Sequence, residues 1–486
     1  MLFNSTEFLL FLPVVFLLYW FVFNKNLIRQ NLLILTASYF FYGWWSWKFL
    51  LLLILSTLLD YLYGFGVATA NRRKSKLFLW LSIINNFGIL AIFKYYNFFA
   101  IEFQQVFDIV GVHFNPVLIQ VVLPLGISFY TFHGMSYVFD IYRGIREPVT
   151  GFIDYAVFVC FFPLLVAGPI ERANHLLPQV QKKRVFNYIQ AVEGCRLILW
   201  GMFKKIVIAD SLAVVVNDIF NRPHSQNAFA LITGAVGFSF QIYADFSGYS
   251  DIAIGTAKLL GFELFSNFRF PYFSRDVAEF WRRWHISLSS WFRDYLYIPL
   301  GGSKKGKPAA VRNIFIVFLV SGLWHGAGWN FLVWGGIHAC GFLPLLLLNK
   351  NRRHAAAIVA ADSKLPTLKE LFQIIGTFVF VTFAWIFFRI HSVQKGIDYI
   401  KKIVIDSMLH PGQYLHRPKG ASVVLYIMPF ILIDWYIRRN ERCIRMPKVH
   451  KAVRFIIYLV MFKCCIDKFM IRESETLTQN FIYFKF

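Results

Sequence analysis

Residues 371–388 read LFQIIGTFVFVTFAWIFF, a run without a charged side chain. As an α-helix this run would be about 27 Å long, close to the thickness of the hydrocarbon core of a bilayer. Comparable apolar runs occupy residues 8–23, 49–62, 77–93 and 423–437. Segments of this kind number about ten to twelve along the chain, so the sequence predicts an all-α, polytopic membrane protein.

The composition supports a protein embedded in lipid. Of the 486 residues, 57% are hydrophobic and 16% are charged, whereas roughly a quarter of a typical soluble domain is charged. The chain has 50 Lys and Arg against 26 Asp and Glu, a net charge of +24. In a soluble protein this excess would suggest nucleic-acid binding. Here the basic residues cluster between apolar runs, as the positive-inside rule predicts, so we expect no nucleic-acid partner.

The basic clusters also predict a topology. Lys25 and Arg29 follow the first apolar run, and a cluster at 72–76 follows the third. If both lie in the cytosol, the N-terminus lies outside. Because successive spans alternate in direction, the basic loops at 304–312, 350–353 and 438–454 are then also predicted to be cytosolic. The first run has neither a basic n-region nor a small-residue cleavage site, so we interpret it as a retained span. The sequence thus predicts a multi-pass protein of the cytoplasmic (inner) membrane.

The chain reads as one integral domain, residues 1–486, without a repeat or a long linker. Residues 1–94 are plain apolar segments and predict scaffold helices. Residues 95–120 mix aromatic and polar positions, which favours an interfacial helix. From 123 to 339 the apolar segments are interrupted by Gly, Pro, Ser and ionisable residues. Such irregularity is tolerated at membrane depth only inside protein or beside a wet cavity, which predicts the catalytic core there. Residues 371–486 predict C-terminal helices and an aromatic tail.

One histidine of this core, His285, lies in EFWRRWHISLSSWFRDYLYIPLGG at 279–302. A helix over 276–297 is predicted, with Asp276 as its N-cap and Glu279 completing a capping box. The same spacing predicts a buried stripe, made of Trp281, His285, Leu288 and Phe292. A helix this charged would lie at the interface or re-enter the membrane. The alternative is an interfacial helix whose histidine only hydrogen-bonds a neighbour.

The second histidine, His325, lies in SGLWHGAGWNFLVWGG at 321–336. The glycines of this stretch thin the helix surface, so a substrate or another helix can approach closely. An imidazole in such apolar surroundings stays neutral and basic, and an ionisable residue there is a functional candidate. A packed core histidine is the alternative. His338, one turn past Trp334, is predicted to be structural.

Other polar residues allow two interpretations each. Asp245 and Asp251 in YADFSGYSDIAIG would fix a helix break or orient an imidazole, although structural polar packing is favoured. A basic loop, with Lys304, Lys305 and Lys307, would attract the phosphates of a donor such as coenzyme A, or would only anchor the topology. The loop has no P-loop or dinucleotide fingerprint. Cysteine and histidine spacings indicate neither a disulfide framework nor a zinc site, so no metal or bound cofactor is expected.

These residues together suggest acyl transfer. A base in an apolar tunnel suits removal of a proton from an alcohol as the alcohol attacks an acyl carbonyl. General-base catalysis of this kind raises the reaction rate by about 10²–10⁴-fold. The other histidine would hold the donor or stabilise the developing oxyanion. The residues expected to line the substrate path are Arg283, Trp284, Ser287, Trp324 and Asn330.

The chain resembles the membrane-bound O-acyltransferases, in the bacterial branch that contains the alginate O-acetylation protein. The matching stretches are LPLGISFYTF, AGPIER, YADFSGYSDIAIG, SNFRFPYFSRDVAEFWRRWHISLSSWFRDYLYIPLGG, SGLWHGAGWNFLVWGG and the terminal FIYFKF. The resemblance implies a multi-helix scaffold around a central funnel. It also implies that His325 is the catalytic histidine and that His285 occupies the second signature position.

The resemblance further implies an activity. An acetyl group from a cytosolic donor, acetyl-CoA, would pass through the membrane to an extracytoplasmic polysaccharide such as alginate or peptidoglycan. It would be passed directly or through a secreted or membrane-anchored, esterase-like partner. The alternatives are a transporter of a lipid-linked saccharide or another anionic solute, and an inactive scaffold that recruits such a partner. The tail at 481–486 would lie at the interface or shape the acceptor site.

Overall fold

The computed structural model describes residues 1–486 except 120–121, 356–357, 410–421, 441–445, 447–448 and 475–486. The described residues form helices and connecting turns, with no strand among them, as the sequence predicts. The helices form two compact units. The first comprises Met1–Gly194 and Ala253–Phe265, and the second comprises Cys195–Ile252 and Ser266–Phe486. The predicted tail at 481–486 lies outside the described residues.

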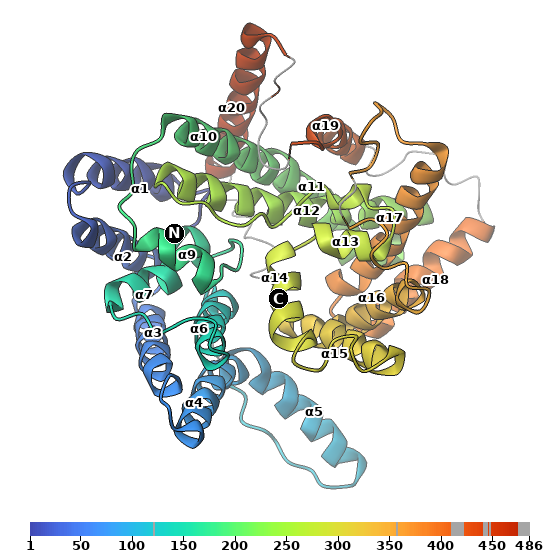
Figure 1. Ribbon diagram of the computed structural model, residues 1–486. Helices are drawn as coiled ribbons and strands as arrows, with labels where there is room; N and C mark the ends of the chain where they lie inside the picture. The colour runs from blue at the N-terminus through green and yellow to red at the C-terminus, as the bar shows by residue number, and fades with distance from the viewer. Residues whose placement is uncertain (120–121, 356–357, 410–421, 441–445, 447–448, 475–486) are drawn as a thin grey trace. The chain divides into compact units, whose positions relative to one another are not determined.

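The first unit contains the N-terminal scaffold helices. They are α1 (Thr6–Leu17), α2 (Leu27–Gly43), α3 (Trp47–Val67), α4 (Arg72–Leu90), α5 (Tyr96–Ile109), α6 (Ile127–Tyr142), α7 (Phe152–Cys160), α8 (Phe162–Leu165) and α9 (Ala173–Val180). Helix α3 packs against α4 and α6 (Figure 1). Asp60 of α3 accepts hydrogen bonds from Ser82 and Asn86 of α4 at 2.8 and 2.9 Å. Buried polar contacts therefore tie these apolar helices together.

Helices α10 (Tyr188–Met202) and α12 (Ala228–Leu259) each belong partly to both units, and the second unit holds the remaining helices. These are α11 (Asp210–Asn221), α13 (Val277–Arg283), α14 (Ile286–Phe292), α15 (Lys307–His325), α16 (Trp329–Leu347), α17 (Leu368–Arg389), α18 (Val393–Leu409), α19 (Ser422–Ile437) and α20 (Lys451–Ser474). Short π-helices, η3 (Phe203–Ala209) and η6 (Arg293–Tyr297), precede α11 and follow α14.

Glycines bring α15 and α16 together as a tight helical hairpin (Figure 1). A Cβ on Gly322 would lie 2.3 Å from the Phe331 carbonyl oxygen, and one on Gly335 would lie 2.4 Å from that of Phe318. Both distances are far inside van der Waals contact, so only glycine fits at these crossings. The sequence left open whether a substrate or another helix approaches these glycines. At Gly322 and Gly335 it is another helix.

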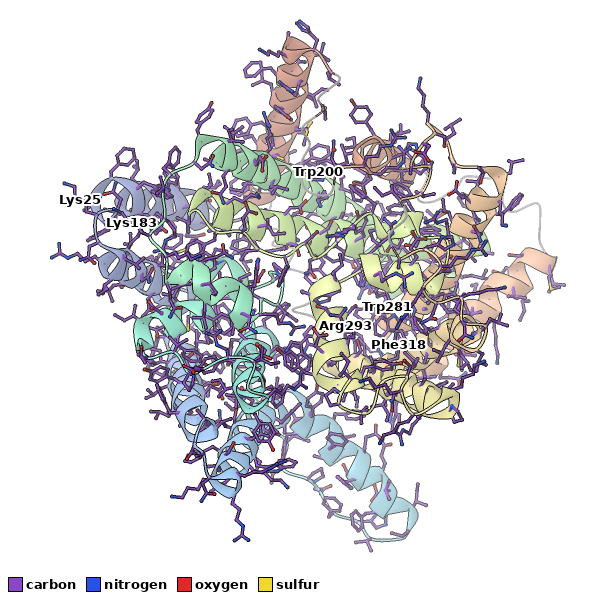
Figure 2. The ribbon with its side chains drawn as sticks, in the orientation of Figure 1. Lys25, Lys183, Trp200, Trp281, Arg293 and Phe318 are labelled. Atoms are coloured by element: carbon purple, nitrogen blue, oxygen red, sulfur yellow. The ribbon has the colours of Figure 1, made fainter. Side chains whose placement is uncertain are left out.

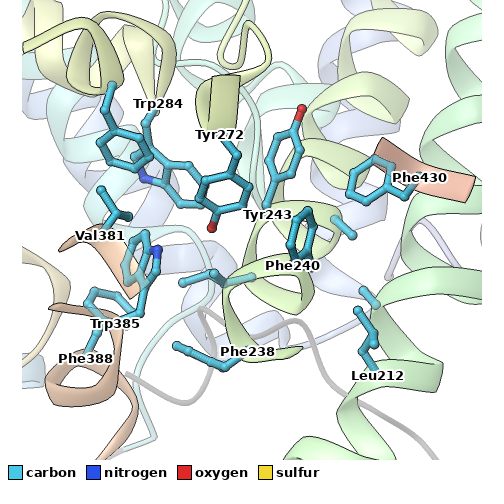
Figure 3. Close-up of a cluster of buried hydrophobic side chains, with 14 of the residues drawn as sticks. Leu212, Phe238, Phe240, Tyr243, Tyr272, Trp284, Val381, Trp385, Phe388 and Phe430 are labelled. Carbon is cyan, nitrogen blue, oxygen red and sulfur yellow. The ribbon is translucent and has the colours of Figure 1, made fainter. Parts of the chain in front are cut away.

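An aromatic core fills the second unit (Figure 3). Trp284, Trp334 and Trp385 are at most 1% exposed. The Trp334 and Trp385 rings stack with their centroids 5.7 Å apart, and the Trp284 ring lies 5.0 Å from Trp385. Aromatic pairs at such separations stabilise a core by about 0.5–1.5 kcal/mol each beyond the area that they bury. This core therefore gives α13, α16 and α17 a rigid common anchor.

Six helical segments among the described residues are long and apolar enough to cross a membrane. They cover Trp47–Val67, Arg72–Ile109, Ala228–Leu259, Lys307–His325, Trp329–Leu347 and Leu368–Arg389. Two shorter apolar helical segments cover Thr6–Val22 and Val423–Ile437. A multi-pass membrane protein is thus confirmed, although these segments are fewer than the ten to twelve spans counted from sequence.

Two local predictions need correction. The stretch YADFSGYSDIAIG forms no helix break, because it lies within the continuous α12. Most of that helix is buried inside protein, so its polar side chains meet protein partners. The predicted helix over 276–297 is not continuous. It is divided into α13, α14 and η6, with the first break at Trp284 and His285.

Candidate active site

The break between α13 and α14 places His285 in an unusual backbone conformation. His285 has φ 44° and ψ 53°, in the left-handed region. This region costs a residue with a Cβ roughly 1–2 kcal/mol, so the surrounding structure must hold it there. The turn changes the direction of the chain without moving the predicted stripe out of the core. Trp281, His285, Leu288 and Phe292 are all buried.

The start of α13 is fixed by charged groups. Asp276 caps the helix by accepting a hydrogen bond from the Glu279 amide at 2.7 Å, as predicted. In a capping box the Glu279 carboxylate would accept from the backbone amide of the N-cap, Asp276. Here it accepts instead from the Arg275 amide at 2.8 Å. The same carboxylate forms ion pairs with Arg275 and Arg283, at 3.0 and 2.8 Å. Arg283 therefore anchors α13, and this pairing does not bring it to the histidines.

His325 is the last residue of α15, where Gly326 ends the helix. The residue is 3% exposed. Aromatic rings surround it, with centroids 4.8 Å away for Trp324, 5.1 Å for Trp334 and 5.2 Å for Phe388. A Cβ on Gly326 would lie 2.1 Å from the Phe331 ring, so the turn after the histidine is also tightly packed.

The structure brings the two predicted histidines together. The His285 and His325 rings lie 6.4 Å apart, centroid to centroid. The Trp324 ring neighbours both, with its centroid 5.9 Å from that of His285 and 4.8 Å from that of His325. Forty positions of sequence separate the two histidines, so their proximity results from the tertiary fold. At this separation, one small group at the edge of the ring pair could contact both imidazoles.

Burial determines the charge state of His285, which lies outside the candidate spans. The side chain is fully buried, and this loss of hydration lowers its pKa to about 3. The imidazole is therefore neutral at physiological pH. A neutral imidazole has one N–H and one lone pair, so it can accept a proton or a hydrogen bond. This is the state that the sequence predicts for an imidazole in apolar surroundings.

A pocket of about 540 Å³ is lined by residues close in sequence to both histidines, although neither histidine is part of its lining. Trp281 and Ser321, each four residues before one of the histidines, are part of its lining. Trp281, Phe318 and Arg293, labelled in Figure 2, contribute to it from α13, α15 and η6. Arg352 also lines it, so two guanidinium groups accompany a largely apolar wall. This combination suits a ligand with an anionic end and an apolar end.

The other residues predicted to line the substrate path have different surroundings. Trp324 and Trp284 are buried beside the histidines. Ser287 is 2% exposed, and its hydroxyl donates to Asn267 Oδ1 at 2.9 Å. Asn330 donates to the Phe387 carbonyl at 3.2 Å, which ties α16 to α17. These contacts give Ser287 and Asn330 supporting positions around the histidine pair.

The basic loop of the predicted donor site is exposed. Its members, Lys304, Lys305 and Lys307, point to solvent, and Lys307 Nζ donates to the Leu347 carbonyl at 3.0 Å. Ser303, directly before them, lines the pocket, whereas the three lysines are not part of its lining.

Several residues of this site were missed from the sequence. Arg293 of the predicted helix and Arg352 of a basic loop resemble other cations of the chain, and only the fold shows that both line one pocket. Asn267 lies eighteen positions before His285 and hydrogen-bonds to it, at 3.1 Å from Nδ1. The sequence has no local signal for that pairing, because it depends on the left-handed turn at His285.

His338 and the two aspartates have structural surroundings. His338 Nδ1 accepts from Trp281 Nε1 at 3.3 Å, and the rings of Trp281 and Trp334 each lie 5.0 Å from it. Asp245 pairs with Lys205 at 2.9 Å and Asp251 with Lys204 at 2.6 Å. These contacts fit the packing roles favoured for all three residues. No cluster of three or more metal-ligating side chains occurs in the described part of the chain.

Known proteins share the sequence that builds this site. Residues 147–390 match the model of the MBOAT, membrane-bound O-acyltransferase family. The probable alginate O-acetylase AlgI of Pseudomonas aeruginosa is 39% identical over 398 residues, which are 81% of this chain and 73% of that protein. The peptidoglycan O-acetyltransferase of Helicobacter pylori is 35% identical over 510 aligned positions, covering 99% of this chain and 91% of that protein.

A more distant relative covers a smaller part. The teichoic acid D-alanyltransferase of Bacillus subtilis is 31% identical over 227 residues, 44% of this chain and 57% of that protein. The match to the family model includes both histidines, Asn267 and all the residues named above that line the pocket. Family membership favours the enzyme over the transporter that the sequence left open. The chain belongs to the membrane-bound O-acyltransferase family, and it is an O-acyltransferase.

Proposed function

We propose that the protein transfers an acetyl group from acetyl-CoA to hydroxyl groups of an extracytoplasmic polysaccharide, alginate or peptidoglycan, directly or through an esterase-like partner protein. One observation carries this proposal. Two histidine rings lie 6.4 Å apart inside an aromatic enclosure, and a pocket that two arginines line includes the residues four positions before each histidine. The relatives are named for O-acetylation of alginate and of peptidoglycan, and these activities support the acetyl group and the acceptor class. The protein resides in the cytoplasmic membrane.

In the proposed reaction His325 is the general base. Its imidazole takes the proton of the acceptor hydroxyl as the hydroxyl oxygen attacks the thioester carbonyl. The new C–O bond forms, the C–S bond breaks, and the proton passes from the histidine to the departing thiolate of CoA. The surrounding rings exclude water, which limits hydrolysis of the thioester. His285, Trp284 and Trp324 enclose the reacting group, while Ser287 and Asn330 support that enclosure.

The donor is proposed to occupy the pocket beside the histidines. Its phosphates would contact Arg293 and Arg352, and the exposed Lys304, Lys305 and Lys307 would attract it from the cytosol. The thioester end would extend along Phe318 and Ser321 toward His325. Ser321 is one helical turn before His325 on α15, so a group at Ser321 is already close to the base.

The activity test uses purified protein in detergent with acetyl-CoA. Unacetylated alginate and peptidoglycan are supplied in parallel, each with and without the esterase-like protein encoded nearest to this gene. We expect acceptor-dependent release of CoA and acetyl ester on one of the two polymers. Release that stays at the level of hydrolysis with every acceptor and partner would contradict the proposal.

The donor site has its own test. Arg293→Ala and Arg352→Ala together should raise the KM for acetyl-CoA by at least about tenfold and leave kcat nearly unchanged, since hydrogen bonds to charged groups contribute about 1.5–3 kcal/mol each. Lys463→Ala, which removes an exposed cation paired with Asp467, is the matched control. An unchanged KM would place the donor elsewhere.

A further inference from the structure

Asn267 makes an unusual number of contacts with the residues around His285. It is 1% exposed. Its side-chain oxygen lies 2.9 Å from the Ser287 hydroxyl, 3.1 Å from His285 Nδ1 and 3.4 Å from the Ser287 amide nitrogen. Its side-chain nitrogen donates to Ser250 Oγ of α12 at 3.2 Å, and its backbone carbonyl accepts from the Ile286 amide at 3.0 Å. All these residues belong to the second unit.

These contacts fix which way the amide points. A backbone N–H can only donate, so the Asn267 atom that faces the Ser287 amide must be the oxygen. The nitrogen then faces Ser250, whose hydroxyl can accept. His285 Nδ1 faces the same oxygen, so Nδ1 must carry the hydrogen. A neutral imidazole has one N–H, and Nε2 therefore carries the lone pair.

The same residue holds the backbone turn. Asn267 bonds to the amides of Ile286 and Ser287, the first two residues of α14. These bonds use donors at the start of that helix, which lack partners within the helix itself. They also fix the chain directly after the left-handed His285. Asn267 thus controls both the direction of the imidazole and the position of its hydrogen.

We infer that Asn267 is a positioning residue that presents His285 to the substrate as a hydrogen-bond acceptor, with its lone pair at Nε2. This inference rests on the proposed function and narrows the role of His285 within it. The sequence left two roles open for the second histidine, holding the donor or stabilising the oxyanion. Stabilisation of an oxyanion requires a donor, and the hydrogen of this neutral ring is committed to Asn267. His285 instead accepts from an N–H or O–H group of a substrate.

The direct test reads the tautomer by nitrogen NMR. Protein with ¹⁵N-labelled histidine is reconstituted in lipid, and the His285 signals are identified by their loss in His285→Gln. We expect the Nδ1–H tautomer in the wild-type protein and a mixture of tautomers in Asn267→Leu. An Nε2–H tautomer of His285 in the wild-type protein would overturn the inference. This measurement needs no acyl transfer, so its outcome is separate from that of the activity test.

The kinetic test separates positioning from folding. Asn267→Leu removes the acceptor and should lower kcat by about 10- to 100-fold with little change in the KM for acetyl-CoA. Asn267→Asp keeps an acceptor oxygen and restores most of kcat at high pH. The new carboxylate favours the imidazolium form and raises the pKa of His285. The acidic limb of the kcat profile should then move at least one pH unit higher.

The control is Asn86→Leu, which removes a buried amide of the first unit that bonds to Asp60. It should lower thermal stability without moving the pH profile. If Asn267→Asp behaves like this control, with an unmoved acidic limb and no recovery of kcat over Asn267→Leu, Asn267 is only a structural residue. In that case the inference fails while the proposed function still stands.

Discussion

Two groups of buried polar side chains in the second unit follow different rules. Near η3, Lys204 and Lys205 each pair with carboxylates of α12, at 2.6 and 2.9 Å. At the active site, the rings of His285 and His325 are enclosed by aromatic side chains. The ion pairs keep their charges because each charge has a partner. Burial lowers the pKa of His285 instead, so this imidazole stays neutral and keeps a lone pair.

The ion-paired region depends on close helix packing. A Cβ on Gly201 would lie 2.6 Å from the Gly248 carbonyl oxygen, so α10 and α12 approach closely at that point. This approach lets both lysines of η3 reach α12. Although burial disfavours the ammonium, Asp210 and Asp245 raise the pKa of Lys205 above its usual range. The comparison teaches that a buried charge with short-range partners indicates structure, and that the closeness of two buried imidazoles, rather than burial alone, marks the candidate site.

The largest expected effect concerns the histidine pair as a unit. His285→Gln should reduce kcat at least 100-fold, and the double variant with His325→Gln should be little worse than the more impaired single variant. Residues that act in one step are not additive, because losing either one removes the shared function. Single-turnover measurements of acetyl transfer by the three variants check this. Effects that multiply would mean that the two rings act independently.

The second prediction concerns the ion-paired region. Lys205→Met removes the partner of Asp210 and Asp245 and leaves buried carboxylates uncompensated, which should destabilise the protein by about 3–5 kcal/mol. The yield of folded protein should fall, while kcat per folded molecule stays within about twofold. Thermal unfolding followed by tryptophan fluorescence, with kinetics on the folded fraction, provides both values. A large loss of kcat in protein of normal stability would instead assign Lys205 to the reaction.

The smallest effect is a pH dependence of stability. The pKa of His285 is about 3 when folded and about 6.5 when unfolded, so the unfolded chain binds more protons between these values. His285 therefore favours folding above pH 6.5, and this contribution is lost as the pH falls, by up to about 1.4 kcal/mol per pH unit. Thermal unfolding between pH 7 and pH 5 should show a shallower decline for His285→Gln. Identical slopes would mean that His285 is solvated in the folded protein.

The sequence predicted much of this site and missed part of it for physical reasons. Apolar runs and glycine-rich stretches carry local signals, so the membrane helices and the candidate histidines could be recognised. The turn at His285 and the partner residue Asn267 depend on contacts between segments that are apart in sequence. YADFSGYSDIAIG was misread as irregular, because its polar residues find partners on η3 that no local pattern reveals. The two arginines that line the pocket were missed for the same reason.

The central claim is that the imidazole of His325 accepts the proton of the attacking hydroxyl. Its most direct measurement is acceptor-dependent CoA release by purified His325→Gln, beside the wild-type protein and His113→Gln, a variant of a histidine whose side chain is 81% exposed. We predict a fall of at least 100-fold for His325→Gln at unchanged protein stability, and wild-type rates for His113→Gln. Wild-type turnover by His325→Gln would contradict the account.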